Sequence, residues 1–109
     1  NKAEYSAKYL MSGTKDFLWA IDPINDNLFN VFVHLKDFGQ NILDEKNIYF
    51  DAKYLIKNNL NLPHGFSRHL NYIFKEAITN AFKHSDATRI ELKFNYLSGL
   101  LEIELSDNG

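Results

Sequence analysis

The chain has 109 residues, which leaves room for one compact domain and an appendage, because a stable core normally needs about 100 to 150 residues. Hydrophobic residues make up 45% of the chain and aromatic residues 15%, a composition that indicates a globular fold and excludes a disordered one. The net charge of -2 offers no field of one sign for nucleic acid or an anionic membrane, and the absence of cysteine excludes disulfides, thiolate nucleophiles and Cys-ligated zinc.

The sequence contains neither an apolar run long enough to span a membrane nor the basic-then-apolar pattern of a signal peptide. We therefore expect no membrane contact by this chain and a cytoplasmic location, with which a cysteine-free composition is compatible. The chain opens on Asn1 and stops at Gly109, directly after an apolar run, so we interpret it as a piece of a longer protein. A membrane anchor elsewhere in that protein would leave this part on the cytoplasmic side.

The first half of the chain reads as helical. Residues 1–12 fit a helix tail and a turn, and a long helix is expected from Thr14, which serves as N-cap, with a kink at Pro23. Beyond the kink, apolar residues recur at steps of three and four, the heptad spacing of a narrow seam: Leu28, Val31, Leu35, Phe38 and Ile42. This seam either packs on its own domain or forms half of a helical hairpin that dimerises into a four-helix bundle.

The second half alternates between strand and helix patterns. Period-two alternation predicts strands and a broad apolar face at helical spacing predicts a helix, giving a strand at 47–52, a helix at 66–84 and strands at 89–96 and 100–105 joined by a turn at 97–99. We therefore expect an α/β protein, with a two-layer α/β sandwich over 46–109 preceded by a dimerisation helix within 1–45.

Three polar residues share one edge of the expected helix at 66–84. Glu76 and Asn80 are four residues apart and Lys83 follows three later, so the three side chains lie one above another. A carboxylate, an amide oxygen and an ammonium group can polarise a nucleophile, ligate a hard cation and neutralise phosphate charge, as magnesium-nucleotide chemistry requires. Spacing alone leaves the alternative of a solvated helix face.

The residues themselves carry a resemblance. The string Lys-Glu-Ala-Ile-Thr-Asn-Ala-Phe-Lys-His at 75–84 resembles the N-box of the ATP-binding domain of sensor histidine kinases, a branch of the GHKL (Bergerat-fold) ATPase superfamily. Asp107-Asn108-Gly109, directly after the last expected strand, looks like the opening of the first glycine box. The segment at 16–23 resembles the second helix of the dimerisation and phosphotransfer region, so the resemblance covers nearly the whole chain.

The resemblance implies roles for individual residues. Asn80 would be the magnesium ligand and Glu76 the acid or base residue near the γ-phosphate. Lys83 would contact phosphate, Asp107 would accept a hydrogen bond from the adenine amino group, and Gly109 would belong to the nucleotide-binding turn. The implied cofactors are ATP and Mg²⁺, and the implied partners are a second copy, through the long N-terminal helix, and the receiver domain of a response regulator.

The chain also departs from the family pattern. No glycine-rich lid follows Gly109, and residues 1–12 contain no histidine that could accept phosphate, so we expect this piece alone to be inactive and to bind nucleotide weakly or not at all. No two histidines stand at i, i+4, which makes a catalytic zinc site improbable. Two other interpretations stay open: another GHKL ATPase such as an anti-sigma-type kinase, and a non-catalytic dimerisation module.

Overall fold

The computed structural model describes residues 23–57 and 59–109 of the chain. The helix expected from Thr14 and the segment resembling a phosphotransfer helix fall largely within residues 1–22, and so lie outside the described residues.

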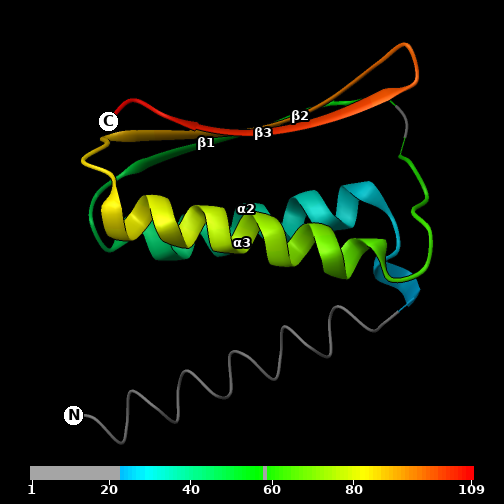
Figure 1. Ribbon diagram of the computed structural model, residues 1–109, viewed down its shortest axis with the longest axis horizontal. Helices are drawn as coiled ribbons and strands as arrows, with labels where there is room; N and C mark the ends of the chain where they lie inside the picture. The colour runs from blue at the N-terminus through cyan, green and yellow to red at the C-terminus, as the bar shows by residue number, and fades with distance from the viewer. Residues whose placement is uncertain (1–22, 58) are drawn as a thin grey trace, which may run out of the picture.

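The described residues form a small mixed α/β domain of two layers, one of helices and one of strands (Figure 1). The elements are, in order, η1 (Pro23–Asn25), α2 (Leu28–Asp44), β1 (Tyr49–Leu55), α3 (Phe66–His84), β2 (Arg89–Leu97) and β3 (Leu100–Asp107). β2 lies between the other two strands, parallel to β1 and antiparallel to β3. The predicted α/β class is confirmed. In the part of the chain that the structure describes, no helix combines the length and the apolar character needed to cross a membrane.

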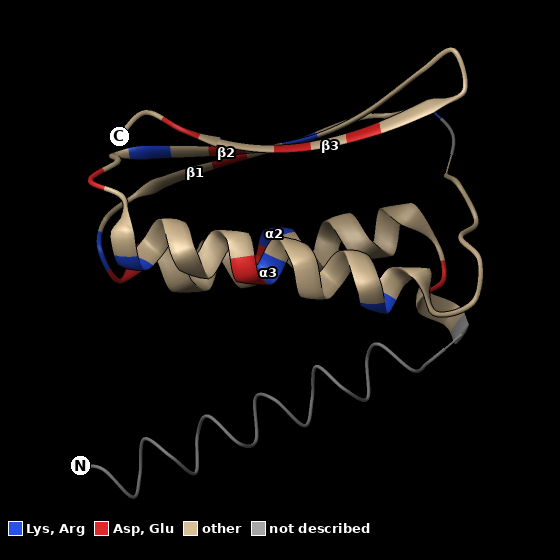
Figure 2. Ribbon diagram, viewed as in Figure 1, with Lys and Arg blue, Asp and Glu red and all other residues tan. Residues whose placement is uncertain are grey.

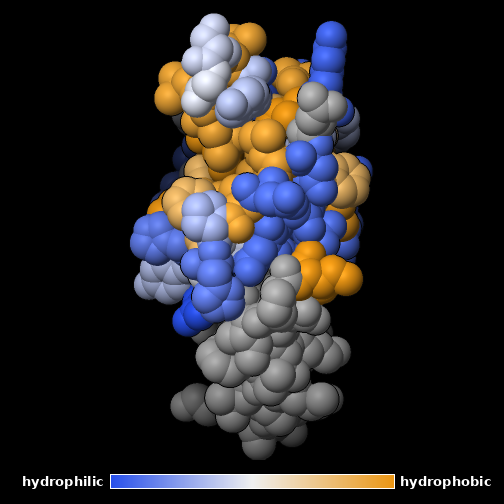
Figure 3. Space-filling model, turned by 90° about the vertical axis from the view of Figure 1, so that its right-hand side faces the viewer, coloured by the Kyte–Doolittle hydropathy of each residue, from blue (hydrophilic) through white to orange (hydrophobic). Residues whose placement is uncertain are grey.

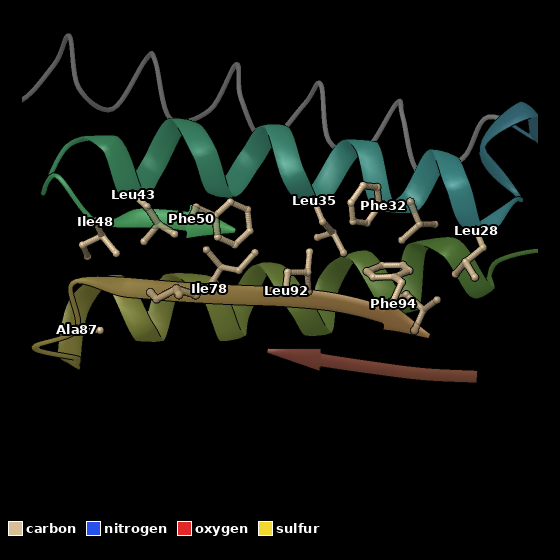
Figure 4. Packing of buried hydrophobic residues seen from close by; sticks show 13 residues of the cluster. Leu28, Phe32, Leu35, Leu43, Ile48, Phe50, Ile78, Ala87, Leu92 and Phe94 are labelled. Atoms are coloured by element: carbon tan, nitrogen blue, oxygen red, sulfur yellow. The ribbon is translucent and has the colours of Figure 1, made fainter. Parts of the chain in front are cut away.

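The core lies between the sheet and the two helices. Alternate residues of β2 point toward the helices, and Ile90, Leu92 and Phe94 are each 0% exposed. α3 contributes Ile78, which is also fully buried, and the close view shows Ile78, Leu92 and Phe94 directed into one shared interior (Figure 4). Both helices cover the same side of the sheet, and no described element covers its other face.

The heptad-spaced seam on α2 is covered within the chain itself. Leu28, Val31 and Leu35 are 0% exposed and belong to the core, while Phe38 and Ile42 pack against it. The expectation that these side chains supply dimer contacts is therefore wrong for the three buried ones, because α3 and the sheet already occupy the seam. The alternative interpretation, packing on its own domain, describes them correctly.

α2 begins with its own N-cap. After η1, Asn27 adopts an extended conformation and its side-chain oxygen accepts a hydrogen bond from the backbone N–H of Asn30 at 2.9 Å, which caps α2. Next to this cap, Asp26 accepts a hydrogen bond from the buried hydroxyl of Ser67 at 3.0 Å and lies 3.3 Å from His64. These contacts hold the beginnings of α2 and α3 together.

The open face of the sheet is strongly charged. Asp51 on β1 pairs with Arg89 at 2.6 Å, and Lys53 lies 3.1 Å from Glu91 on β2 and 3.5 Å from Asp51. The hydrogen bond with Glu91, reinforced by the charge of Asp51, raises the pKa of Lys53. Charges of both signs therefore alternate along β1 and β2 on this face, and Figure 2 shows acidic and basic residues on the sheet.

Apolar side chains reach solvent at the β2–β3 hairpin. Ser98 and Gly99 both have positive φ angles, 52° and 81°, which form the tight turn between the strands. Beside the turn, Leu97 and Leu100 are opposite one another in the register and mostly exposed. Figure 3 shows the resulting gathering of hydrophobic atoms over this end of the molecule.

Candidate functional site

An open cleft of about 650 Å³ lies between the C-terminal half of α3 and the end of β3. It sits at the end of the molecule where the C-terminus lies (left in Figure 1). From α3, one face supplies the lining through residues at i, i+3, i+4 and i+7: Ala77, Asn80, Ala81 and His84. This spacing is set by the helical repeat, so the cleft wall follows directly from the helix that the sequence predicts.

The sheet supplies the floor and the opposite wall. Ile90 and Leu105 form an apolar floor, and Asp107, the last residue of β3, stands opposite Ile90 in the antiparallel register. Residues opposite one another in such a pair share a face, so Asp107 is on the same side of the sheet as the helices. An apolar lining with a carboxylate at its edge suits a heterocycle that carries a hydrogen-bond donor.

The carboxylate of Asp107 is held by the turn that follows it. Its Oδ1 atom accepts the backbone N–H of Gly109 at 3.0 Å. Oδ2 accepts no hydrogen bond from the described residues, so one oxygen of an exposed carboxylate remains for a ligand.

Gly109 closes the cleft against the loop that follows α3. A Cβ atom at this position would lie 2.7 Å from the backbone nitrogen of Ala87 and 2.8 Å from Oγ of Ser85. The backbone can approach this loop so closely only because residue 109 has no side chain.

Among the site residues expected from the sequence, Asn80, Asp107 and Gly109 line this one cleft. Asn80 is exposed, as a ligand-binding group must be. Glu76, four residues before Asn80, and Lys83, three residues after it, are also exposed but do not line the cleft. The fold therefore brings three of the five expected site residues together in the cleft and leaves the other two outside it.

Sequence reasoning missed the polar lining residues at the end of α3 and in the loop after it. His84, the last residue of α3, lines the cleft together with Ser85 and Asp86 from the loop after α3. Their position next to the N-box-like string was the available signal, since a loop that follows a site helix normally borders the same site.

The residues present fit a nucleotide with magnesium. The cleft volume falls within the range of small-molecule sites, which is roughly 300 to 1,000 Å³. Among the described residues no group of three or more His, Cys, Asp or Glu could hold a metal ion alone. Magnesium is commonly bound through one or two protein oxygens plus the phosphates of its nucleotide, so the single amide oxygen of Asn80 is compatible with it.

A scan against models of protein families finds no match to this chain, and a search of curated proteins finds no significant relative.

Proposed function

We propose that this chain carries part of the nucleotide site of a sensor histidine kinase of the GHKL superfamily. One observation supports this above all: Asn80, from the N-box-like string, and Asp107, from the glycine-box-like triplet, line the same cleft although 27 positions separate them in the numbering. Two motifs recognised separately thus meet in space, as an incomplete Bergerat-type fold would require. A mixed sheet with both helices on one face is in keeping with such a fold.

Each residue then has a chemical task. Asp107 would accept a hydrogen bond from the exocyclic amino group of adenine through its second oxygen, and the apolar lining beside it would contact the base. Asn80 would hold, through its amide oxygen, the magnesium ion that accompanies the phosphates. When bound, this ion offsets the negative charge of the phosphates during in-line transfer.

The exposed edge of α3 beside the cleft would contact the phosphates of the nucleotide. Glu76 stands one helical turn before Asn80 and accepts or donates a proton near the γ-phosphate, and the ammonium group of Lys83 neutralises phosphate charge. Both side chains lie outside the cleft as it stands, which agrees with phosphates that extend along the helix rather than into the floor.

The longer protein would transfer phosphate from ATP to a histidine and then to an aspartate of a response regulator, acting as a cytoplasmic homodimer. The dimer contacts would have to come from residues other than Leu28, Val31 and Leu35, since these are buried in the chain's own core. Another GHKL ATPase would use the same cleft, and only its phosphate acceptor would differ.

The test is a titration of the ¹⁵N-labelled chain with Mg-ATP at millimolar concentration, followed by backbone NMR shifts. We expect weak binding, with shifts concentrated at Asn80, Asp107 and Gly109 and none at the distant turn of Ser98 and Gly99. Asn80→Ala should remove the dependence of binding on magnesium. Asn41→Ala is the matched control, because Asn41 is also an exposed helical asparagine but lies on α2, outside the cleft.

Two results would overturn the proposal. An absence of shifts in the cleft would show that the chain holds no nucleotide site. Shifts that survive Asn80→Ala with their magnesium dependence intact would remove the ligand role of Asn80. A non-catalytic module would give the first of these results.

A further inference from the structure

Asn108 makes four hydrogen bonds to the two residues that precede and begin β2. Its side-chain oxygen accepts the backbone N–H groups of Thr88 at 3.0 Å and Arg89 at 3.1 Å. Its side-chain nitrogen donates to Oγ1 of Thr88 at 3.0 Å, and its own backbone N–H donates to the carbonyl of Arg89 at 3.2 Å. Both ends of the carboxamide are therefore engaged, although Asn108 lies at the surface.

Thr88, which bonds to Asn108, is also held by a hydrogen bond to β1. The carbonyl of Thr88 accepts the backbone N–H of Tyr49 at 2.9 Å, which ties the loop to β1. The preceding Ala87 is buried, and its N–H donates to Oγ of Ser85 at 2.9 Å. Asn108 thus joins the end of β3 to a loop that is anchored at both sides.

The neighbours of Asn108 in the chain are the two cleft residues Asp107 and Gly109. Asp107 accepts the N–H of Gly109, and Gly109 lies against Ser85 and Ala87 without room for a side chain. When the residue between them is fixed by four hydrogen bonds, the direction of the Asp107 carboxylate is fixed as well.

We infer that Asn108 is a positioning residue that aims the Asp107 carboxylate into the cleft and so sets the preference of the site for a purine that carries an amino group. This inference rests on the proposed nucleotide site and adds to it the residue that makes base recognition sharp. Asn108 touches no ligand; it acts through Asp107. An oxygen that accepts a hydrogen bond discriminates between bases only if its position is held, since a mobile carboxylate can turn away from an unsuitable edge.

The experiment compares ATP with inosine triphosphate, which has a carbonyl oxygen in place of the amino group. Dissociation constants of both magnesium nucleotides are measured by NMR titration of the chain and of Asn108→Leu, which removes every side-chain hydrogen bond at similar size. We expect the chain to prefer ATP about 10-fold or more, the scale of a hydrogen bond to a charged group. In Asn108→Leu this preference should fall to less than about 3-fold, with little change in the affinity for inosine triphosphate.

Asn108→Asp is the conservative control, because a carboxylate still accepts from the N–H groups of Thr88 and Arg89 and should retain most of the preference. If Asn108 had a purely structural role, Asn108→Leu would weaken the binding of both nucleotides equally and leave the ratio of their dissociation constants unchanged. If Asn108→Leu does not fold, Thr88→Val deletes only the Oγ1 acceptor and should reduce the preference by at least about 2-fold.

The outcomes separate the two proposals. A chain that binds neither nucleotide overturns the proposed function and this inference together. A chain that binds both equally overturns the role of Asp107 and hence that of Asn108. A chain that prefers ATP, with the preference intact in Asn108→Leu or in Thr88→Val, overturns this inference alone and leaves the nucleotide site in place.

Discussion

Gly39 of α2 lies against the ring of Phe50 on β1, and replacing it by alanine tests the packing of the core. A Cβ atom there would lie 2.5 Å from Cε2 of Phe50 and 2.7 Å from its Cζ. Carbon atoms prefer about 3.5 to 4.0 Å, so the ring would have to retreat by about 1 Å. Phe50 is only 5% exposed and cannot swing into solvent, so its neighbours would have to move.

Two effects of opposite sign decide the magnitude. Overpacking of a core typically costs about 1 to 3 kcal/mol, whereas alanine in a helix is favoured over glycine by about 1 kcal/mol. We therefore expect Gly39→Ala to lower the free energy of unfolding by up to about 2 kcal/mol. Urea denaturation followed by circular dichroism measures this value, provided that the m-value stays constant.

The same substitution in a Phe50→Leu background isolates the steric part. Leucine lacks the two nearest ring atoms, so Gly39→Ala should there become neutral or stabilise the protein by up to about 1 kcal/mol. The double-mutant cycle should accordingly show a coupling energy of about 1 to 3 kcal/mol. Stabilisation of the unmodified chain by Gly39→Ala, or equal effects in both backgrounds, would refute this reasoning.

Two further substitutions probe the interior. Ile78→Ala should cost about 2 to 5 kcal/mol in urea denaturation, because the side chain is 0% exposed, and a near-neutral value would mean that α3 presents a different face to the sheet. Tyr54→Phe should leave stability unchanged or raise it by up to about 1 kcal/mol, since the buried Tyr54 hydroxyl has no hydrogen-bond partner among residues 23–57 and 59–109. Burial also raises the pKa of Tyr54, so the folded state keeps the phenol proton to a higher pH than the unfolded state does. The free energy of unfolding should therefore fall as pH rises above 10, the ordinary pKa of tyrosine. An equal alkaline loss of stability in Tyr54→Phe would assign that loss to other groups.

The sequence predicts the elements best where one local pattern governs them. α3 begins and ends at the predicted residues, Phe66 and His84, because a broad apolar face at helical spacing extends over its whole length. β1, in contrast, continues to Leu55 beyond the expected end at residue 52. Its charged residues Asp51 and Lys53 break the apolar pattern, and their partners Arg89 and Glu91 stand on a strand far along the chain.

The seam on α2 shows a second limit. Heptad spacing states that a helix has a narrow apolar face, but it does not identify what covers that face. Here the covering elements are α3 and the sheet of the same chain, which become neighbours of α2 only after folding.

In the candidate site, too, local sequence patterns predict some residues, and contacts between distant segments determine the others. The residues of α3 could be chosen from helical spacing, and the pairing of Asn80 with Asp107 was implied only by resemblance. The role of Asn108 could not be foreseen, because asparagine between aspartate and glycine is an ordinary turn signal and its four hydrogen bonds depend on a loop about 20 positions away.

The ion pairs on the charged face of the sheet limit where further protein structure can pack against this domain. A further layer stacked on that side would have to strip water from Asp51, Lys53, Arg89 and Glu91, at a penalty of about several kcal/mol for each ion. The outer margins of β1 and β3, whose backbone groups have no neighbouring strand among the described residues, carry no such obstacle. Additional structure is therefore expected to pair with the edge strands, in the plane of the sheet, while the charged face remains in contact with water.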